Sequence, residues 1–125
     1  MKILVVDDED DVKILFQQRF RREIKEGEME FMFAFSGEEA LTYLRQHNHE
    51  AVLILSDINM PGMSGLELLQ QIKASFDDPS PNVIMVTAYG DQENYNHAMK
   101  HGANGFVTKP VDFISLKAKL KVLAR

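Results

Sequence analysis

Four short apolar runs divide the sequence, and a polar residue follows each of them. The runs cover residues 3–6, 52–55, 83–86 and 106–107. Uninterrupted apolar runs of this length are typical of strands that are buried on both faces, as in a parallel sheet. Residues 29–35 instead place aromatic side chains at alternate positions, which predicts a strand with unequal faces near a sheet edge.

Helical periodicity separates these strands. The first predicted helix ends near Gly27 and has an apolar stripe at positions three and four apart. The stripe consists of Val12, Leu15, Phe16, Phe20 and Ile24. Two Ser-x-x-Glu patterns predict the next helix starts at Ser36 and Ser64, because a serine side chain can cap the backbone N–H three residues later.

Two more helices complete the pattern. The fourth is predicted from Asp91 to His101, with Gly102 as its C-terminal cap, and Asp112 is the expected N-cap of the fifth. Strands that alternate with helices imply right-handed crossovers and helices on both faces of a parallel sheet. The sequence therefore predicts the α/β class with five strand-then-helix units.

The polar residues that follow the apolar runs should gather at one place. In an open parallel sheet the carboxyl ends of the strands share one edge, and ligands bind in the crevice there. This logic brings together Asp7, Asp8, Asp57, Thr87 and Lys109. Three carboxylates, a hydroxyl and an amine predict a metal-dependent phosphoryl-transfer site.

Each candidate has a chemical role and a simpler alternative. Asp7 and Asp8 offer hard oxygen ligands for Mg²⁺ or Mn²⁺, or they merely cap the first helix. Asp57 can act as a nucleophile towards phosphorus. Without a cation, clustered carboxylates repel one another, so at least one pKa should be raised. Lys109 precedes a proline, and a cis bond there would turn the lysine towards the acidic residues rather than into solvent.

Composition limits the class of protein. The length of 125 residues fits one domain over 1–125, and 45% hydrophobic with 26% charged residues is typical of a globular protein. The absence of cysteine excludes disulfides and thiolate metal sites. A net charge of −5 argues against direct nucleic-acid binding. Neither a membrane span nor a signal peptide is recognisable, so a cytoplasmic location is expected.

Two weaker signals remain open. His97 and His101 lie one helical turn apart and could share a metal, although a solvated helix face is the simpler interpretation. The last helix is rich in cations, which either complement its C-terminal dipole or help a partner dock. These cations are Lys117, Lys119, Lys121 and Arg125.

An ordered set of motifs along the whole chain resembles the receiver domain of bacterial two-component response regulators. The motifs are Ile-Leu-Val-Val-Asp-Asp-Glu at 3–9, Asp-Ile-Asn-Met-Pro-Gly-Met-Ser-Gly at 57–65, Val-Thr-Ala at 86–88, Gly-Ala at 102–103 and Phe-Val-Thr-Lys-Pro at 106–110. The resemblance implies a flavodoxin-like (βα)5 doubly wound fold with a parallel sheet in the order 2-1-3-4-5.

The resemblance also implies roles for the site. Asp57 would accept a phosphoryl group from a phosphohistidine on a sensor histidine kinase or phosphotransfer protein. Asp8, Asp57 and the backbone carbonyl of Asn59 would coordinate Mg²⁺ or Mn²⁺, with Asp7 acting through water. Lys109 would pair with phosphoryl oxygens, and Thr87 would hydrogen-bond to one of them.

Thr87 and Phe106 are the switch pair that the resemblance implies. Movement of Thr87 would let the Phe106 ring turn inward and change the surface around the fourth and fifth predicted helices, which would control an output domain or downstream protein. Phe106 stands where many relatives have tyrosine. Because phenylalanine has no hydroxyl, the coupling between Thr87 and Phe106 would depend on how the ring packs. The alternative is that Phe106 is simply a core residue without a switch role. Asn59 and Tyr89 match positions that tune phosphoryl lifetime in the family.

Such a domain promotes its own phosphorylation and dephosphorylation without being a turnover enzyme. The resemblance also suggests a phosphorylation-dependent dimer, but Asn104-Gly105 replaces an acidic residue that many DNA-binding relatives use to dimerise. A haloacid-dehalogenase-type phosphatase would place its nucleophile after the first strand. A flavodoxin-like cofactor binder would need a phosphate loop there. A phosphorylation-independent protein-binding module is the remaining alternative.

Overall fold

The computed structural model describes residues 1–47, 53–75, 81–88 and 91–123, which contain five strands and six helices. The strands are β1 (Lys2–Val6), β2 (Glu30–Ala34), β3 (Leu53–Asp57), β4 (Asn82–Ala88) and β5 (Gly105–Lys109). The helices are α1 (Asp10–Arg19), α2 (Arg21–Lys25), α3 (Gly37–His47), α4 (Gly65–Ser75), α5 (Gln92–Lys100) and α6 (Phe113–Leu123). Three residues with a predicted place or role lie outside the described residues. They are Val52 of the predicted strand, Tyr89 with its predicted tuning role and Arg125 of the last predicted helix.

The five strands form one parallel sheet in the order β2-β1-β3-β4-β5. This order confirms the predicted α/β fold, and β2 lies at a sheet edge as its alternating pattern indicates. Central strands are the most apolar because both of their faces are covered: Ile3, Leu4, Leu53 and Ile54 are 0% exposed.

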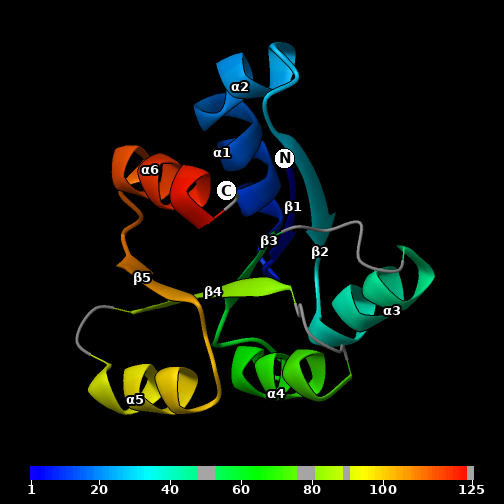
Figure 1. Cartoon of the computed structure of the whole chain (residues 1–125), viewed down its shortest axis with the longest axis vertical. Helices are drawn as coiled ribbons and strands as arrows, with labels where there is room; N and C mark the ends of the chain where they lie inside the picture. The colour runs from blue at the N-terminus through cyan, green and yellow to red at the C-terminus, as the bar shows by residue number, and fades with distance from the viewer. Residues whose placement is uncertain (48–52, 76–80, 89–90, 124–125) are drawn as a thin grey trace.

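Helices cover both faces of this sheet (Figure 1). One apolar layer packs α1 and α6 against the sheet, with Phe16, Phe20 and Leu116 among its buried residues. The opposite layer contains buried residues of α3, α4 and α5, including Leu44 and Leu68. Within the described ranges, no helix combines the length and apolar character that crossing a membrane requires.

The first predicted helix is divided at Phe20 into two helices, α1 and α2. The Phe20 backbone has φ −109° and ψ 20°, which ends α1, and α2 begins at the next residue. Its ring is 0% exposed and packs against other phenylalanine rings, so burial of this ring accompanies the break. The predicted stripe was also wrong at Leu15 and Ile24, which are 39% and 37% exposed. The helices predicted as fourth and fifth are therefore α5 and α6.

The predicted helix ends are confirmed. The side chains of Ser36, Ser64, Asp91 and Asp112 each accept a hydrogen bond from the backbone N–H three residues later, at 3.0, 3.2, 3.1 and 3.3 Å. Gly102 follows α5 with φ +90°, a left-handed conformation that glycine adopts without strain. The four N-terminal caps fix where α3, α4, α5 and α6 leave the sheet edge that carries the polar residues.

Candidate functional site

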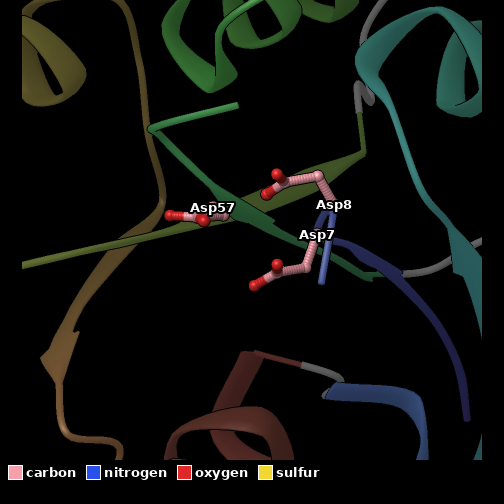
Figure 2. Close-up of side chains that lie close together, drawn as sticks. All are labelled: Asp7, Asp8 and Asp57. Carbon is pink, nitrogen blue, oxygen red and sulfur yellow. The ribbon is translucent and has the colours of Figure 1, made fainter. Parts of the chain in front are cut away.

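Asp7 and Asp8 follow β1, and Asp57 is the last residue of the neighbouring strand β3. The strands are in parallel register, with Val6 opposite Ser56, so the residues that follow both reach the same edge. Figure 2 shows the three carboxylates gathered at these strand ends. One oxygen from each residue lies within 4.8 Å of the others. The structure thus assembles an acidic cluster, consisting of Asp7, Asp8 and Asp57.

Burial makes it costly to keep all the carboxylates of this cluster charged. Asp57 is 5% exposed and Asp7 is 8% exposed, whereas Asp8 is exposed. Burial raises the pKa of Asp7, and the nearby Asp57 charge raises it further, although the Glu9 N–H opposes both effects. The pKa of Asp7 is thus raised chiefly by burial, and the repulsion that the sequence predicts makes a smaller contribution. A bound cation would relieve this repulsion.

Helix capping does not account for the two adjacent aspartates. The N-cap of α1 is Glu9, and no side-chain cap hydrogen bond forms there. Asp7 Oδ1 instead accepts a hydrogen bond from the Glu9 N–H at 2.9 Å, within the turn that precedes the helix. This contact orients one carboxylate of the acidic cluster, and it leaves the second Asp7 oxygen for other partners.

Lys109 brings a positive charge to the same place from the end of β5. Its ammonium Nζ lies 3.3 Å from Asp57 Oδ2, and its peptide bond to Pro110 is cis, as the sequence allowed. Burial lowers the pKa of Lys109, but the charge and hydrogen bond of Asp57 outweigh that effect and the pKa is raised. The lysine is therefore protonated at neutral pH and neutralises part of the acidic cluster.

Thr87 reaches the edge from β4 and is 1% exposed. Within the described part of the chain, its Oγ1 is the buried side-chain oxygen that has no hydrogen-bond partner. A buried hydroxyl without a partner costs roughly 1–3 kcal/mol relative to a paired one. The hydroxyl is thus free to donate to a group that enters the site, and it makes no hydrogen bond to the acidic cluster.

Phe106 lies within β5 opposite Met85 of β4, and Asn59 follows β3 at the edge. Phe106 in β5 is half-buried and meets Tyr95 of α5 edge-on, with ring centroids 4.9 Å apart and an interplanar angle of 80°. Asn59 is exposed, and its backbone N–H donates to Asp57 Oδ1 over 3.4 Å. Phe106 is therefore partly accessible from solvent while it also packs against the core layer of α3, α4 and α5, so its switch role stays a prediction.

The loop after Asp57 is held by contacts that sequence reasoning missed. Met63 N–H donates to Glu38 Oε1 at 3.1 Å, and Gly65 N–H donates to the Ile58 carbonyl at 2.8 Å. Gly65 also lies against the backbone of Asp57, where a Cβ would overlap the carbonyl oxygen. The only sequence signal was the glycine itself within the loop motif. These contacts fix the backbone that carries the candidate nucleophile.

A cavity of about 400 Å³ adjoins the acidic cluster between α1, β5 and α6. Asp7, Asp57 and Lys109 form part of its wall, and most of the remaining lining is apolar. Ligand pockets typically measure about 300–1,000 Å³. The cluster is thus accessible to a small group such as a phosphoryl.

The cations of α6 have intramolecular partners. Lys117 Nζ lies 2.8 Å from Glu23 Oε2, and Lys121 Nζ lies 3.0 Å from Glu28 Oε1. Lys119 donates to the Phe106 carbonyl at 3.0 Å. These contacts tie α6 to α2 and β5, so the basic side chains serve the fold, which the sequence pattern did not indicate.

Comparison with known proteins agrees with this geometry. The family model described as response regulator receiver domain matches residues 3–121. The chain is 33% identical over 121 residues to a chemotaxis protein CheY homolog of Campylobacter jejuni, covering 97% of this chain and 90% of that protein. The chain is also 32% identical to the response regulator RppA of Synechocystis. That match covers all of this chain and 51% of the length of RppA, so the chain spans about half of that relative.

Solved structures give the same result. A response regulator receiver domain protein from Clostridium thermocellum superposes with a TM-score of 0.86 at 29% identity, covering 98% of this chain and 93% of that chain. The similarity extends over all five strands and the site edge, so fold and sequence point to one family.

Proposed function

This chain belongs to the response regulator receiver domain family, and we propose that it is a phosphorylation-controlled switch of a two-component phosphorelay. In this proposal Asp57 accepts a phosphoryl group from a phosphohistidine on a sensor histidine kinase or a phosphotransfer protein. The observation that carries the proposal is the buried Asp57 carboxylate, which has two further carboxylates within 4.8 Å and the Lys109 ammonium 3.3 Å away.

The transfer is a displacement at phosphorus. An Asp57 carboxylate oxygen forms the new O–P bond while the P–N bond to the imidazole breaks, and the imidazole nitrogen retains the bonding electron pair. Lys109 is protonated and adjacent, so it can pair with a phosphoryl oxygen as negative charge moves onto Asp57. Thr87 would donate its unpaired hydroxyl to another phosphoryl oxygen.

The acidic cluster has the donor set that Mg²⁺ or Mn²⁺ prefers, because all of its ligands are carboxylate oxygens. We propose that Asp8, Asp57 and the backbone carbonyl of Asn59 hold the ion, with Asp7 acting through water. When bound, such an ion neutralises charge on the phosphoryl oxygens. The clustering of the three carboxylates supports this assignment, because a cation between them would offset their mutual repulsion.

The proposed switch couples Thr87 to Phe106. Movement of Thr87 towards a phosphoryl group would vacate space next to β5, and the Phe106 ring would leave its edge-on contact with Tyr95 and turn inward. The surface around α5 and α6 would change as a result, and an output domain or a downstream protein would read that change. In this proposal the unphosphorylated chain already samples an inactive and an active surface, and phosphorylation shifts the equilibrium towards the active one.

The proposal also covers the extent of the domain, its chemistry and its partners. We propose one receiver domain over 1–125 that acts as a switch with self-catalysed phosphorylation and dephosphorylation, not as an enzyme with a diffusible substrate. Direct binding to nucleic acid or membrane is not expected, and the cytoplasmic location stays a prediction. A phosphorylation-dependent dimer would have to accommodate Asn104, whose Oδ1 already accepts from Lys73 at 2.9 Å.

Intact mass spectrometry tests the proposal. The native chain is incubated with acetyl phosphate, with Mg²⁺ or with a chelator, beside Asp57→Asn and the exposed control Asp10→Asn. We expect one phosphoryl adduct that requires Mg²⁺, is lost in Asp57→Asn and persists in Asp10→Asn. No adduct with acetyl phosphate or with a phosphorylated histidine phosphotransfer protein would favour the alternative, a phosphorylation-independent protein-binding module.

A further inference from the structure

His97 and His101 form a second group of potential metal ligands, separate from the acidic cluster. His97 lies in the last turn of α5, and His101 is the C-cap of that helix. Their ring centroids are 5.6 Å apart with an interplanar angle of 60°, and His97 is exposed while His101 is half-buried. From this geometry we propose that the two histidines bind a divalent transition-metal ion of the Zn²⁺, Cu²⁺ or Ni²⁺ class.

The separation of the rings is close to what one shared ion requires. A zinc–nitrogen bond of about 2.1 Å and a ring radius of about 1.2 Å place each centroid roughly 3.3 Å from the ion. With a tetrahedral angle of about 109°, the two centroids are then roughly 5.4 Å apart. The observed 5.6 Å differs by only a few tenths of an ångström, which side-chain rotation supplies. Two histidines at i and i+4 share one helix face in metal-binding helices for the same reason.

The surroundings add a neutral polar group from a second helix. Gln70 of α4 places its side-chain Nε2 3.4 Å from His101 Nε2. Rotation of this amide presents its oxygen in place of its nitrogen, so Gln70 can support an ion at His101. The end of α5 also favours a cation through the helix dipole, whereas Lys100 in the same turn opposes it.

Ligand type separates this site from the acidic cluster. Imidazole nitrogens suit zinc, copper and nickel, whereas magnesium prefers oxygen ligands. Among the described residues, no third His, Cys, Asp or Glu joins the pair at metal-ligand distance. The ion would therefore keep water ligands, and binding would be weaker than at a closed structural site. The proposal is independent of phosphorylation at Asp57.

Titration with Zn²⁺ tests the proposal on the untagged chain. Mg²⁺ is kept in excess to occupy the acidic cluster, and binding is followed by calorimetry and by the NMR signals of the imidazole rings. We expect one Zn²⁺ per chain that shifts the rings of His97 and His101. His97→Gln and His101→Gln should each weaken binding by about tenfold or more, while the control His47→Gln should not.

Two more variants sharpen the test. Gln70→Glu replaces the neighbouring amide by a carboxylate and should tighten Zn²⁺ binding by about tenfold. Asp8→Asn changes the acidic cluster only and should leave Zn²⁺ affinity unchanged. Equal affinity in the native chain and in both histidine variants would overturn the proposal. Loss of Zn²⁺ binding in Asp8→Asn would also overturn it, because the ion would then lie in the acidic cluster.

Discussion

Replacing Asp7 by asparagine should stabilise the metal-free chain, even though it removes a member of the acidic cluster. The Asp7 side chain is buried, and its carboxylate shares the cluster with Asp8 and Asp57. Asparagine has nearly the same shape, and its side-chain oxygen can still accept the hydrogen bond from the Glu9 N–H. The substitution therefore removes a negative charge while keeping the local contact.

The magnitude follows from the separation of the carboxylates. Two unit charges at 4.8 Å, the upper limit of the oxygen separations in the acidic cluster, repel by roughly 3.5 kcal/mol at an effective dielectric constant of about 20. The Lys109 ammonium, 3.3 Å from Asp57, offsets part of this repulsion, and water screens the exposed Asp8. We therefore expect Asp7→Asn to raise the free energy of unfolding by about 1 kcal/mol.

The effect should depend on pH in a defined direction. Burial raises the pKa of Asp7 in the folded chain above its value in the unfolded chain. Ionisation of Asp7 therefore costs stability: the cost is absent below the unfolded pKa and is complete above the folded one. The advantage of Asp7→Asn over the native chain should thus be small at acidic pH and grow as the pH rises towards neutrality.

Urea unfolding measures both effects, in chelator and in Mg²⁺. The native chain should gain stability from Mg²⁺ by mass action, and Asp7→Asn should gain less. Asp10→Asn is the matched control, because Asp10 is exposed in the first turn of α1 and its neutralisation should slightly destabilise that helix. An Asp7→Asn chain that is no more stable than the native chain in chelator at neutral pH would refute the reasoning.

Three other substitutions test separate contacts. Glu23→Gln should lower the free energy of unfolding by about 1 kcal/mol at neutral pH, because it weakens the pair with Lys117. The Lys117 hydrogen bond lowers the pKa of Glu23, so the difference in stability between the native chain and Glu23→Gln should disappear as the pH falls through the titration of that carboxyl. A difference in urea unfolding that does not depend on pH would contradict a stabilising ion pair. Gly65→Ala should cost about 3 kcal/mol or more, because its Cβ would overlap the Asp57 carbonyl oxygen; an unchanged melting temperature would exclude that overlap. Thr87→Val should stabilise the unphosphorylated chain by about 1 kcal/mol by removing an unpaired buried hydroxyl, and a loss of stability in urea would indicate that the hydroxyl is paired.

The sheet and its edge could be predicted because they follow from local pattern and simple topology. A strand buried on both faces must be apolar throughout, which identified the central strands, and β2 showed its edge position by alternation. Parallel strands present their carboxyl ends together, so the meeting of Asp7, Asp57 and Lys109 followed from the order of elements alone.

Other features depend on distances that no local pattern encodes. The ion pair between Glu23 and Lys117 joins residues 94 positions apart, and it connects α2 to α6. Exposure of Leu15 depends on how α1 lies against its neighbours, and helical spacing alone does not determine this. The unpaired hydroxyl of Thr87 likewise results from the detailed packing around β4.

The assembly of the site from separate strands also affects when the proposed chemistry can begin during synthesis. Asp57 leaves the ribosome well before Lys109, and the lysine joins it only when β5 pairs with β4 at the sheet edge. A nascent or truncated chain that lacks β5 has the nucleophile without its neighbouring ammonium. In the proposed mechanism, the complete arrangement of charges around Asp57 would therefore exist only in chains whose last strand is in place.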